Sequence, residues 1–189
     1  NIENPAQVAR LTADMRASVG RDAPILIDQE GGRVQRMRAP HWREWAPPLD
    51  FVASLAPADR SEAMWLRHRL IADELHAVGI DVNCAPSLDI ARPQTHPFLR
   101  NRCYGETGTE VARLGRSAAD GLSAGGVLPV IKHMPGHGRA EVDSHKRLPW
   151  VTVSRADLSE EFAPFQSLAD LPLAMTAHII FEAIDPDRP

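Results

Sequence analysis

The sequence of 189 residues predicts an α/β protein built on a parallel sheet, and two observations predict it. Four segments with apolar residues at helical spacing alternate along the chain with four short apolar runs. Each run is closely followed by polar side chains of the kind that bind ligands. Helices that alternate with short buried strands are typical of a sheet whose strands run parallel.

The first unit begins with a helix over residues 6–19, whose N-cap and first turn we assign to Asn4 and Pro5. The apolar run over residues 24–27 then forms a short buried strand. Apolar residues recur in the helix at intervals of three and four, and these residues are Val8, Leu11, Met15 and Val19.

The three following units repeat this order of helix and strand. Gly79 closes the second helix, and Gly125 with Gly126 ends the third. The predicted helices span residues 60–78, 107–124 and 155–169, and the strands that follow them span residues 80–84, 127–131 and 173–177.

Polar residues follow all four predicted strands. Asp28 ends the first, Asp89 comes shortly after the second, Lys132 and His133 follow the third, and His178 follows the fourth. Ligand groups at the carboxyl ends of successive parallel strands are typical of the active face of a (β/α)8 TIM-type barrel. An open doubly wound sheet would also place them there, at its switch point.

Four helix–strand units make about half of an eight-unit barrel. We expect a single domain over residues 1–189, truncated at both ends, because the sequence begins on a helix and ends in a proline-rich loop over residues 185–189. Half a barrel would leave an open sheet edge on both sides.

The composition argues against several classes of function. With 21 basic and 25 acidic residues the net charge is −4, and no Lys/Arg block of the kind that binds nucleic acid or an anionic membrane is present. No apolar run approaches the roughly 20 residues that cross a bilayer. Cys84 and Cys103 are too few for a disulfide framework, so we expect reduced thiols in a cytoplasmic protein.

The first motif is DQEGGRVQR at residues 28–36. Its two glycines allow a tight turn or the close approach of a ligand. Arg36 carries a permanent charge, and Asp28 stands at a strand end, where it could accept hydrogen bonds from sugar hydroxyls. An internal ion pair between Asp28 and Arg36 that braces the turn is an equal alternative, and the two roles are compatible.

The second motif is KHMPGHG at residues 132–138, followed by DSH at residues 143–145. His133, His137, Asp143 and His145 could form a zinc site, but their spacing fits no helical ligand pair and Lys132 would repel a cation. Histidines that only satisfy loop carbonyls are a further alternative. We favour acid/base chemistry, because a carboxylate that holds an imidazole suits it to proton transfer near neutral pH.

Other candidates depend on weaker signals. Arg102 lies in a loop, where most arginines are solvated. His178 follows an apolar strand and is either a pocket residue or a core histidine. Trp42, Trp45 and Trp65 could stack on sugars, although packing within a helix is the better interpretation of Trp65.

These motifs together resemble one enzyme family. The segments IDQEGGRVQR at 27–36, KHMPGHG at 132–138 and DSH at 143–145 are similar, in order and interval, to the bacterial β-N-acetylglucosaminidases (NagZ type) of glycoside hydrolase family 3, which act in peptidoglycan recycling. The resemblance implies a (β/α)8 barrel that needs no metal or other cofactor. It also implies retaining hydrolysis through a glycosyl-enzyme, with N-acetylglucosamine linked β-1,4 to anhydro-N-acetylmuramic acid as substrate.

The family's site residues carry over to this sequence by motif. Asp143 and His145 would form the acid/base pair. His137 and His178 are candidate pocket-lining residues beside the residues that the motif match gives. The partners expected are a small carbohydrate or muropeptide, with no nucleic acid, no membrane and a monomeric state. The sugar-binding residues would be Asp28, Arg36, Arg102, Lys132 and His133.

The resemblance lacks one element. The family's nucleophile is an aspartate well downstream of the acid/base pair, and no segment after His178 matches its motif. Asp185 and Asp187 lie in a proline-bracketed loop and are not assigned this role. We expect the nucleophile after residue 189 and no turnover by this chain alone. The alternatives are a β-glucosidase-type member of the family and a non-catalytic sugar-binding or scaffold derivative.

Overall fold

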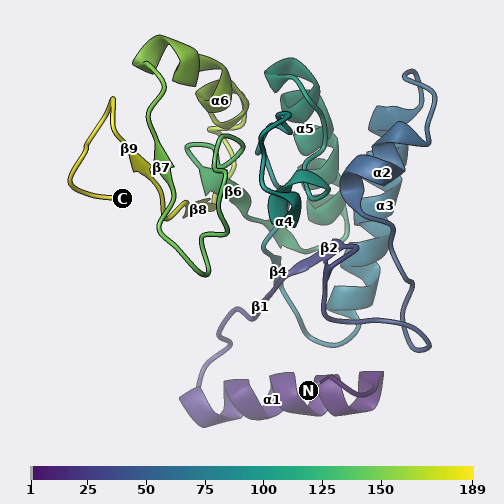
Figure 1. Ribbon diagram of the computed structural model, residues 1–189. Coiled ribbons are helices and arrows are strands. Elements are labelled where there is room, and N and C mark those ends of the chain that lie inside the picture. Colours follow the sequence, from purple (N-terminus) through teal and green to yellow (C-terminus); the bar gives the residue numbers. More distant parts are fainter. Residues whose placement is uncertain (1) are drawn as a thin grey trace.

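Parallel strands run through the middle of the molecule, and three long helices lie side by side along them (Figure 1). The computed structural model describes residues 2–189. β1 (Leu26–Ile27) pairs with β4 (Val82–Asn83), which pairs with β5 (Leu128–Pro129). The sheet continues through a bridge between Ser87 and Lys132, and β6 (Ile131–Met134) pairs with β8 (Ala174–Thr176).

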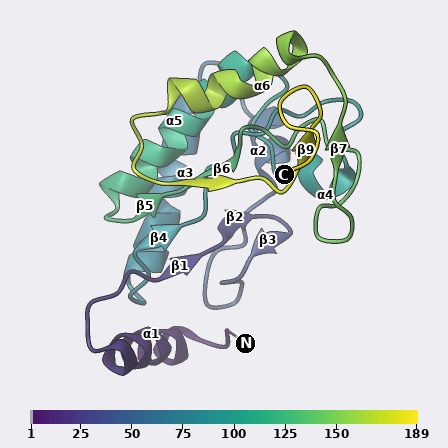
Figure 2. The same cartoon turned by 90° about the vertical axis from the view of Figure 1, so that its left-hand side faces the viewer.

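The order of the strands in space follows their order in the chain. All of these pairs are parallel, as the sequence predicts. A doubly wound sheet reverses its strand order at the switch point, whereas a (β/α) barrel does not. The fold is therefore a segment of a TIM-type barrel, and Figure 2 shows its strands in succession beneath α3, α5 and α6.

The four predicted helices form close to their expected bounds. The side chain of Asn4 caps the first helix by accepting a hydrogen bond from the backbone of Gln7, which confirms the assigned N-cap. Thr107 and Ser154 cap the third and fourth in the same way. The helices are α1 (Pro5–Val19), α3 (Arg60–His76), α5 (Gly108–Ala124) and α6 (Arg155–Ser167).

The apolar runs form strands, but not every run is buried as predicted. Leu26 and Leu128 are 53% and 46% exposed. The fourth strand, β8, is exposed along its length. On α1, Val8 is buried while Leu11, Met15 and Val19 are 43%, 50% and 58% exposed. Burial therefore depends on neighbours that the local pattern does not specify.

Short elements that the sequence did not predict complete the fold. The hairpin of β2 (Gln29–Gly31) and β3 (Val34–Gln35) follows β1 directly. Gly31 and Gly32 both have positive φ, so the two glycines of the first motif make the tight turn. The other new elements are α2 (Pro48–Ala53), α4 (Pro97–Arg100) and the parallel pair of β7 (Trp150–Val151) and β9 (Ile180–Phe181).

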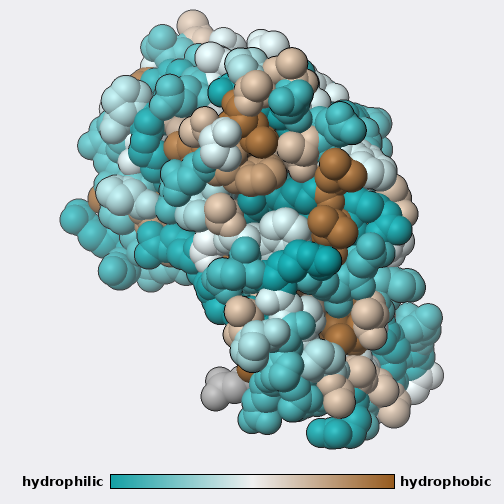
Figure 3. All heavy atoms as spheres, turned by 90° about the vertical axis from the view of Figure 1, so that its right-hand side faces the viewer, coloured by the Kyte–Doolittle hydropathy of each residue, from teal (hydrophilic) through white to brown (hydrophobic). Residues whose placement is uncertain are grey.

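The core lies between the strands and the inner faces of the helices. Its largest cluster joins Val8 of α1 to Ile71 and Leu75 of α3 and to Leu122 of α5. Cys84 and Cys103 are free thiols, as predicted, and both are buried, which raises the pKa of each thiol. The face drawn in Figure 3 is mostly hydrophilic, with hydrophobic residues in small separate groups. No helix within residues 2–189 is long and apolar enough to cross a membrane.

Candidate functional site

A cavity of about 250 Å³ opens where the parallel strands end. It collects side chains from segments that are far apart in the sequence, from the end of β1 to the segment after β8. The predicted acid/base, sugar-binding and pocket-lining residues all line it, apart from Asp143, which contacts a lining residue. The lining comprises Asp28, Val34, Arg36, Phe98, Leu99, Arg102, Lys132, His133, His137, Ser144, His145, Met175, Thr176, Ala177 and His178.

Asp28 and Lys132 form an ion pair at the floor of the cavity. The Lys132 Nζ lies 2.9 Å from Asp28 Oδ1, and the Arg36 guanidinium lies 3.6 Å from Asp28 Oδ2. The predicted Asp28–Arg36 pair is therefore present, while Asp28 still faces the cavity. Burial opposes ionisation of Asp28, but Lys132 and then Arg36 outweigh it and lower the pKa of this carboxyl.

Glu30 forms ion pairs with Lys132 and Arg102. Its side chain is 2% exposed, and it lies 2.5 Å from Lys132 Nζ. Arg102 donates two hydrogen bonds to it, each of 2.9 Å, in a bidentate pair. Burial alone would raise the pKa of Glu30, but Lys132 and Arg102 lower it. Glu30 thus carries a buried negative charge that fixes Lys132 and Arg102 in place.

Asp89 is the buried carboxylate that contacts His133, as Glu30 contacts Lys132 and Arg102. Its carboxylate is fully buried and lies 2.7 Å from His133 Nδ1. Burial opposes ionisation, but His133 and then His137 hold the pKa of Asp89 well below its usual range. On the opposite side of the imidazole ring, His133 Nε2 lies 3.4 Å from Arg102 Nη2.

The structure brings Asp143 and His145 into direct contact. His145 Nδ1 lies 2.9 Å from Asp143 Oδ1, which also accepts a hydrogen bond from the His145 backbone N–H at 3.0 Å. These bonds, the backbone one first, lower the pKa of Asp143. The Asp143 side chain is 11% exposed and that of His145 is 69% exposed. The imidazole is thus held by a carboxylate on one side and open to the cavity and solvent on the other.

Phe98 connects the acid/base loop to the rest of the site. This residue of α4 meets the His145 ring edge-on, with ring centroids 5.0 Å apart. The guanidinium groups of Arg33 and Arg102 lie 4.7 and 5.2 Å from its centroid. Such cation–π contacts are favourable over an aromatic face. The sequence analysis missed Phe98 because no motif marks it.

The remaining histidines differ in their surroundings. His178 lines the cavity and is exposed, so the core alternative for this residue is wrong. His137 also lines the cavity but is buried, and burial lowers its pKa. The part of the chain that the structure describes contains no group of three His, Cys, Asp or Glu residues that could hold a metal ion.

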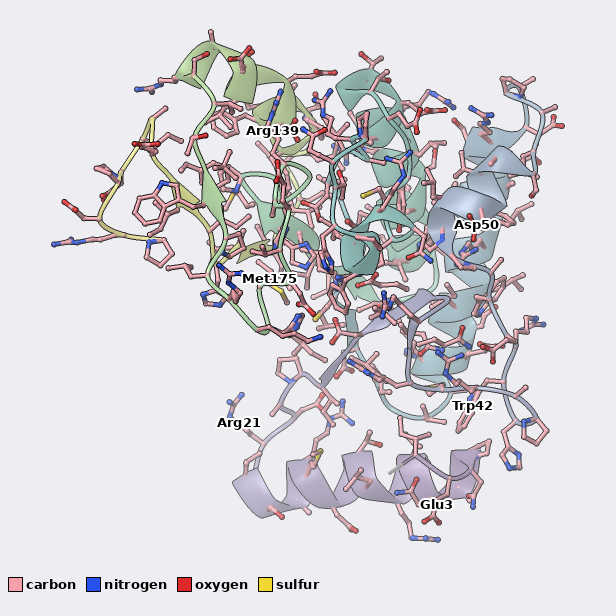
Figure 4. The ribbon with its side chains drawn as sticks, viewed as in Figure 1. Glu3, Arg21, Trp42, Asp50, Arg139 and Met175 are labelled. Carbon is pink, nitrogen blue, oxygen red and sulfur yellow. The ribbon has the colours of Figure 1, made fainter. Side chains whose placement is uncertain are left out.

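The tryptophans do not take part in the site. Trp42 and Trp45 pack against the core cluster of α1 and α3, and Arg67 lies over the Trp45 ring. Trp65 is on α3 and does not line the cavity. Figure 4 shows Trp42 well away from Met175, which does line it. The prediction that Trp42 and Trp45 could stack on a sugar is wrong for this cavity, whose lining among residues 2–189 includes the phenyl ring of Phe98.

The sequence contained a signal for Glu30 and for Asp89. Glu30 stands two positions after Asp28, the interval at which strand residues share a face, and Lys132 meets both carboxylates. Asp89 was recognised as a polar residue after the second strand, but its contact with His133, 44 positions later, depends on the fold.

Comparison with known proteins agrees with this geometry. Residues 1–189 match the N-terminal domain of glycosyl hydrolase family 3. The chain is 38% identical to a β-hexosaminidase of Alkalilimnicola ehrlichii, with 98% of the chain and 54% of the relative covered. It is 36% identical to a β-hexosaminidase of Bordetella avium, with the same coverage.

A solved structure agrees with the fold as well. The crystal structure of native NagZ from Neisseria gonorrhoeae is 31% identical, has a TM-score of 0.89 and covers 100% of this chain and 56% of its own. The chain thus spans about half the length of the relatives that it matches. By the match over residues 1–189, this chain belongs to glycosyl hydrolase family 3, as part of its N-terminal domain.

Proposed function

We propose that this chain carries the sugar-binding site and the proton donor of a β-N-acetylglucosaminidase. One observation carries the proposal: Asp28 after β1 and the β6 residues Lys132 and His133 meet in the same cavity as the Asp143–His145 pair. Its relatives named β-hexosaminidase support the same activity.

The floor of the cavity suits the hydroxyl groups of a terminal sugar. Asp28 offers carboxylate oxygens, while Lys132, Arg36 and Arg102 offer N–H donors beside it. A sugar hydroxyl both donates and accepts, so alternating acceptors and donors hold it better than either alone. The ion pairs keep these groups in place before the sugar arrives, which reduces the cost of ordering them on binding.

His145 is the proposed proton donor to the glycosidic oxygen. Asp143 accepts from Nδ1, so Nε2 is the nitrogen that faces outward to exchange a proton with substrate. Asp143 is ionised at neutral pH, because its hydrogen bonds to His145 lower its pKa, and it therefore stabilises the protonated imidazole. This arrangement replaces the second carboxylic acid of most glycosidases.

We further propose the retaining, covalent course that the family resemblance implies, with N-acetylglucosaminyl-anhydro-N-acetylmuramic acid and its peptide derivatives as substrates. The carboxylate that lines the cavity within residues 2–189 is that of Asp28, which Lys132 holds. The nucleophile would come from a segment after residue 189. Asp185 and Asp187 do not line the cavity. We expect the 189-residue chain on its own to give no turnover.

The test compares His145→Ala with the unaltered full-length protein on a chromogenic β-N-acetylglucosaminide. We expect kcat to fall by roughly 10²–10⁴-fold, the usual contribution of a general acid, while KM changes little. The change removes the proton donor but leaves the floor of the cavity intact.

The matched control is His41→Ala, which removes an exposed histidine that does not line the cavity. We expect this variant to keep full activity. Equal turnover by His145→Ala and the unaltered protein would refute the assignment of the proton donor. Faster hydrolysis of the matching β-glucoside than of the N-acetylglucosaminide would favour the β-glucosidase alternative.

A further inference from the structure

Asp89 is buried and does not line the cavity, but its two carboxylate oxygens contact His133 and His137, which do line it. Oδ1 accepts hydrogen bonds from the backbone N–H groups of His133 and His137, at 3.3 and 2.7 Å. Oδ2 lies 2.7 Å from the ring nitrogen His133 Nδ1 and accepts from Ser87 Oγ at 3.0 Å. The carboxylate is 0% exposed, so these groups and no bulk water surround it.

The surroundings of the His133 ring allow one neutral tautomer. Asp89 is ionised at neutral pH and can only accept, so His133 Nδ1 must carry the hydrogen. On the other side, the Arg102 guanidinium can only donate, so His133 Nε2 must present its lone pair. Two neighbours of opposite character therefore require the same tautomer.

We propose that Asp89 is a positioning residue that fixes His133 in the Nδ1–H tautomer, so that Nε2 accepts a hydrogen bond from one hydroxyl of the bound sugar. This inference deepens the proposed function and rests on it. Nε2 has one lone pair, and the 3.4 Å contact from Arg102 Nη2 is long for a hydrogen bond, so a sugar hydroxyl at normal distance takes that lone pair. Lys132 and Arg102 then donate to a sugar oxygen beside it. The site would thus select a free hydroxyl over a substituent that only accepts.

Replacing Asp89 by asparagine tests this because the two side chains have the same shape. The two backbone N–H groups at Oδ1 would keep the amide oxygen there, so the amide NH₂ would take the place of Oδ2. The NH₂ group donates to His133 Nδ1 and favours the Nε2–H tautomer. That hydrogen would face the donors of Arg102, and the acceptor for the sugar would be lost.

The experiment uses the full-length protein with ¹⁵N-labelled histidine rings, and His133→Gln assigns the His133 signals. We expect Nδ1–H in the unaltered protein and Nε2–H in Asp89→Asn. Calorimetry with N-acetylglucosamine and its monofluorinated analogues then measures the acceptor, since fluorine cannot donate. When fluorine replaces the hydroxyl that donates to His133 Nε2, the affinity of the unaltered protein should fall about tenfold, which corresponds to the loss of one hydrogen bond. In Asp89→Asn the same replacement should change the affinity much less.

Ser87→Ala is the matched control, because it removes one donor to Asp89 Oδ2 and leaves the charge in place. It should keep the Nδ1–H tautomer and the fluorine effect. An Nε2–H signal in the unaltered protein would overturn the inference without any variant, as would an unchanged tautomer in folded Asp89→Asn. Failure of the unaltered protein to bind N-acetylglucosamine would overturn the proposed function instead, and with it the role of Nε2 as acceptor.

Discussion

Buried carboxylates set the positions of the cations and the imidazole at the cavity. Glu30 holds Lys132 and Arg102, and Asp89 holds His133. A buried charge is tolerated where its partners satisfy it, and the loss of one partner leaves the other uncompensated. Single changes among these residues should therefore affect both stability and sugar binding.

Glu30→Gln should weaken the binding of N-acetylglucosamine and also destabilise the fold. The change leaves Lys132 with the half-buried Asp28 and leaves the Arg102 guanidinium without its bidentate carboxylate. We expect a loss of roughly 3–5 kcal/mol in the free energy of unfolding, as for other broken buried pairs. Urea unfolding and calorimetry of the full-length protein measure the two effects.

Glu44→Gln is the control for this prediction. Glu44 pairs with Arg38, the two side chains are 50% and 40% exposed, and this pair lies outside the cavity. An exposed pair contributes about 0–1 kcal/mol, so sugar binding should not change and unfolding should shift little. Similar losses in the two variants would mean that Glu30 has no special relation to the site.

At the scale of elements, α3 and α5 pack closely against each other. Gly121 of α5 faces α3, and a Cβ at this position would overlap the carbonyl oxygen of Trp65 and contact the backbone of Arg69. Backbone atoms of a helix cannot move aside as a flexible side chain would. The absence of a side chain at Gly121 therefore lets the two helices pack closely.

Gly121→Ala should destabilise the protein, although alanine is the better helix former by about 1 kcal/mol. The overlap with Trp65 should outweigh that gain by forcing the helices apart, at about 1–3 kcal/mol for overpacking. Thermal unfolding shows whether the substitution lowers or raises the melting temperature. Ser123→Ala, at an exposed position of the same helix, should be neutral or slightly stabilising. A higher melting temperature for Gly121→Ala would contradict the packing argument.

At the scale of the whole molecule, a buried histidine makes stability depend on pH. His68 of α3 is fully buried, with Nδ1 2.9 Å from the Met64 carbonyl oxygen and Nε2 3.0 Å from the Tyr104 hydroxyl. Burial, and then the charge of Arg67, lowers the pKa of His68 to about 3. The folded protein keeps this ring neutral, whereas the unfolded chain takes up a proton near pH 6.5.

The free energy of unfolding should therefore fall as the pH is lowered from about 6.5 toward 4.5, by about 1.4 kcal/mol per pH unit for this proton. The sign follows because the unfolded state binds more protons in this range. Carboxylates with lowered pKa, such as Asp89, add their own loss as the pH falls through about 4, where the same groups take up protons in the unfolded chain. His68→Gln should flatten the slope between pH 6.5 and 4.5 in urea unfolding, and the exposed His41→Gln should not. Parallel slopes for both variants would contradict this.

The sequence alone determined the features that depend on residues close together along the chain. Helix bounds follow from periodicity and from caps such as Asn4, and the glycine turn at Gly31 follows from its own backbone freedom. The composition of the motifs also indicated Asp28 and Lys132 as site residues. It indicated the contact between Asp143 and His145 as well, because side chains two positions apart can meet within one loop.

Only the tertiary structure decided which distant groups meet. Glu30 contacts Arg102 across 72 positions, and Asp89 contacts His133 across 44. The same holds for burial: Leu11 and Val19 repeat the spacing of Val8, which is 3% exposed, but are themselves 43% and 58% exposed. Ion pairs and burial are properties of two surfaces brought together, so a pattern within one segment specifies only one side of each contact.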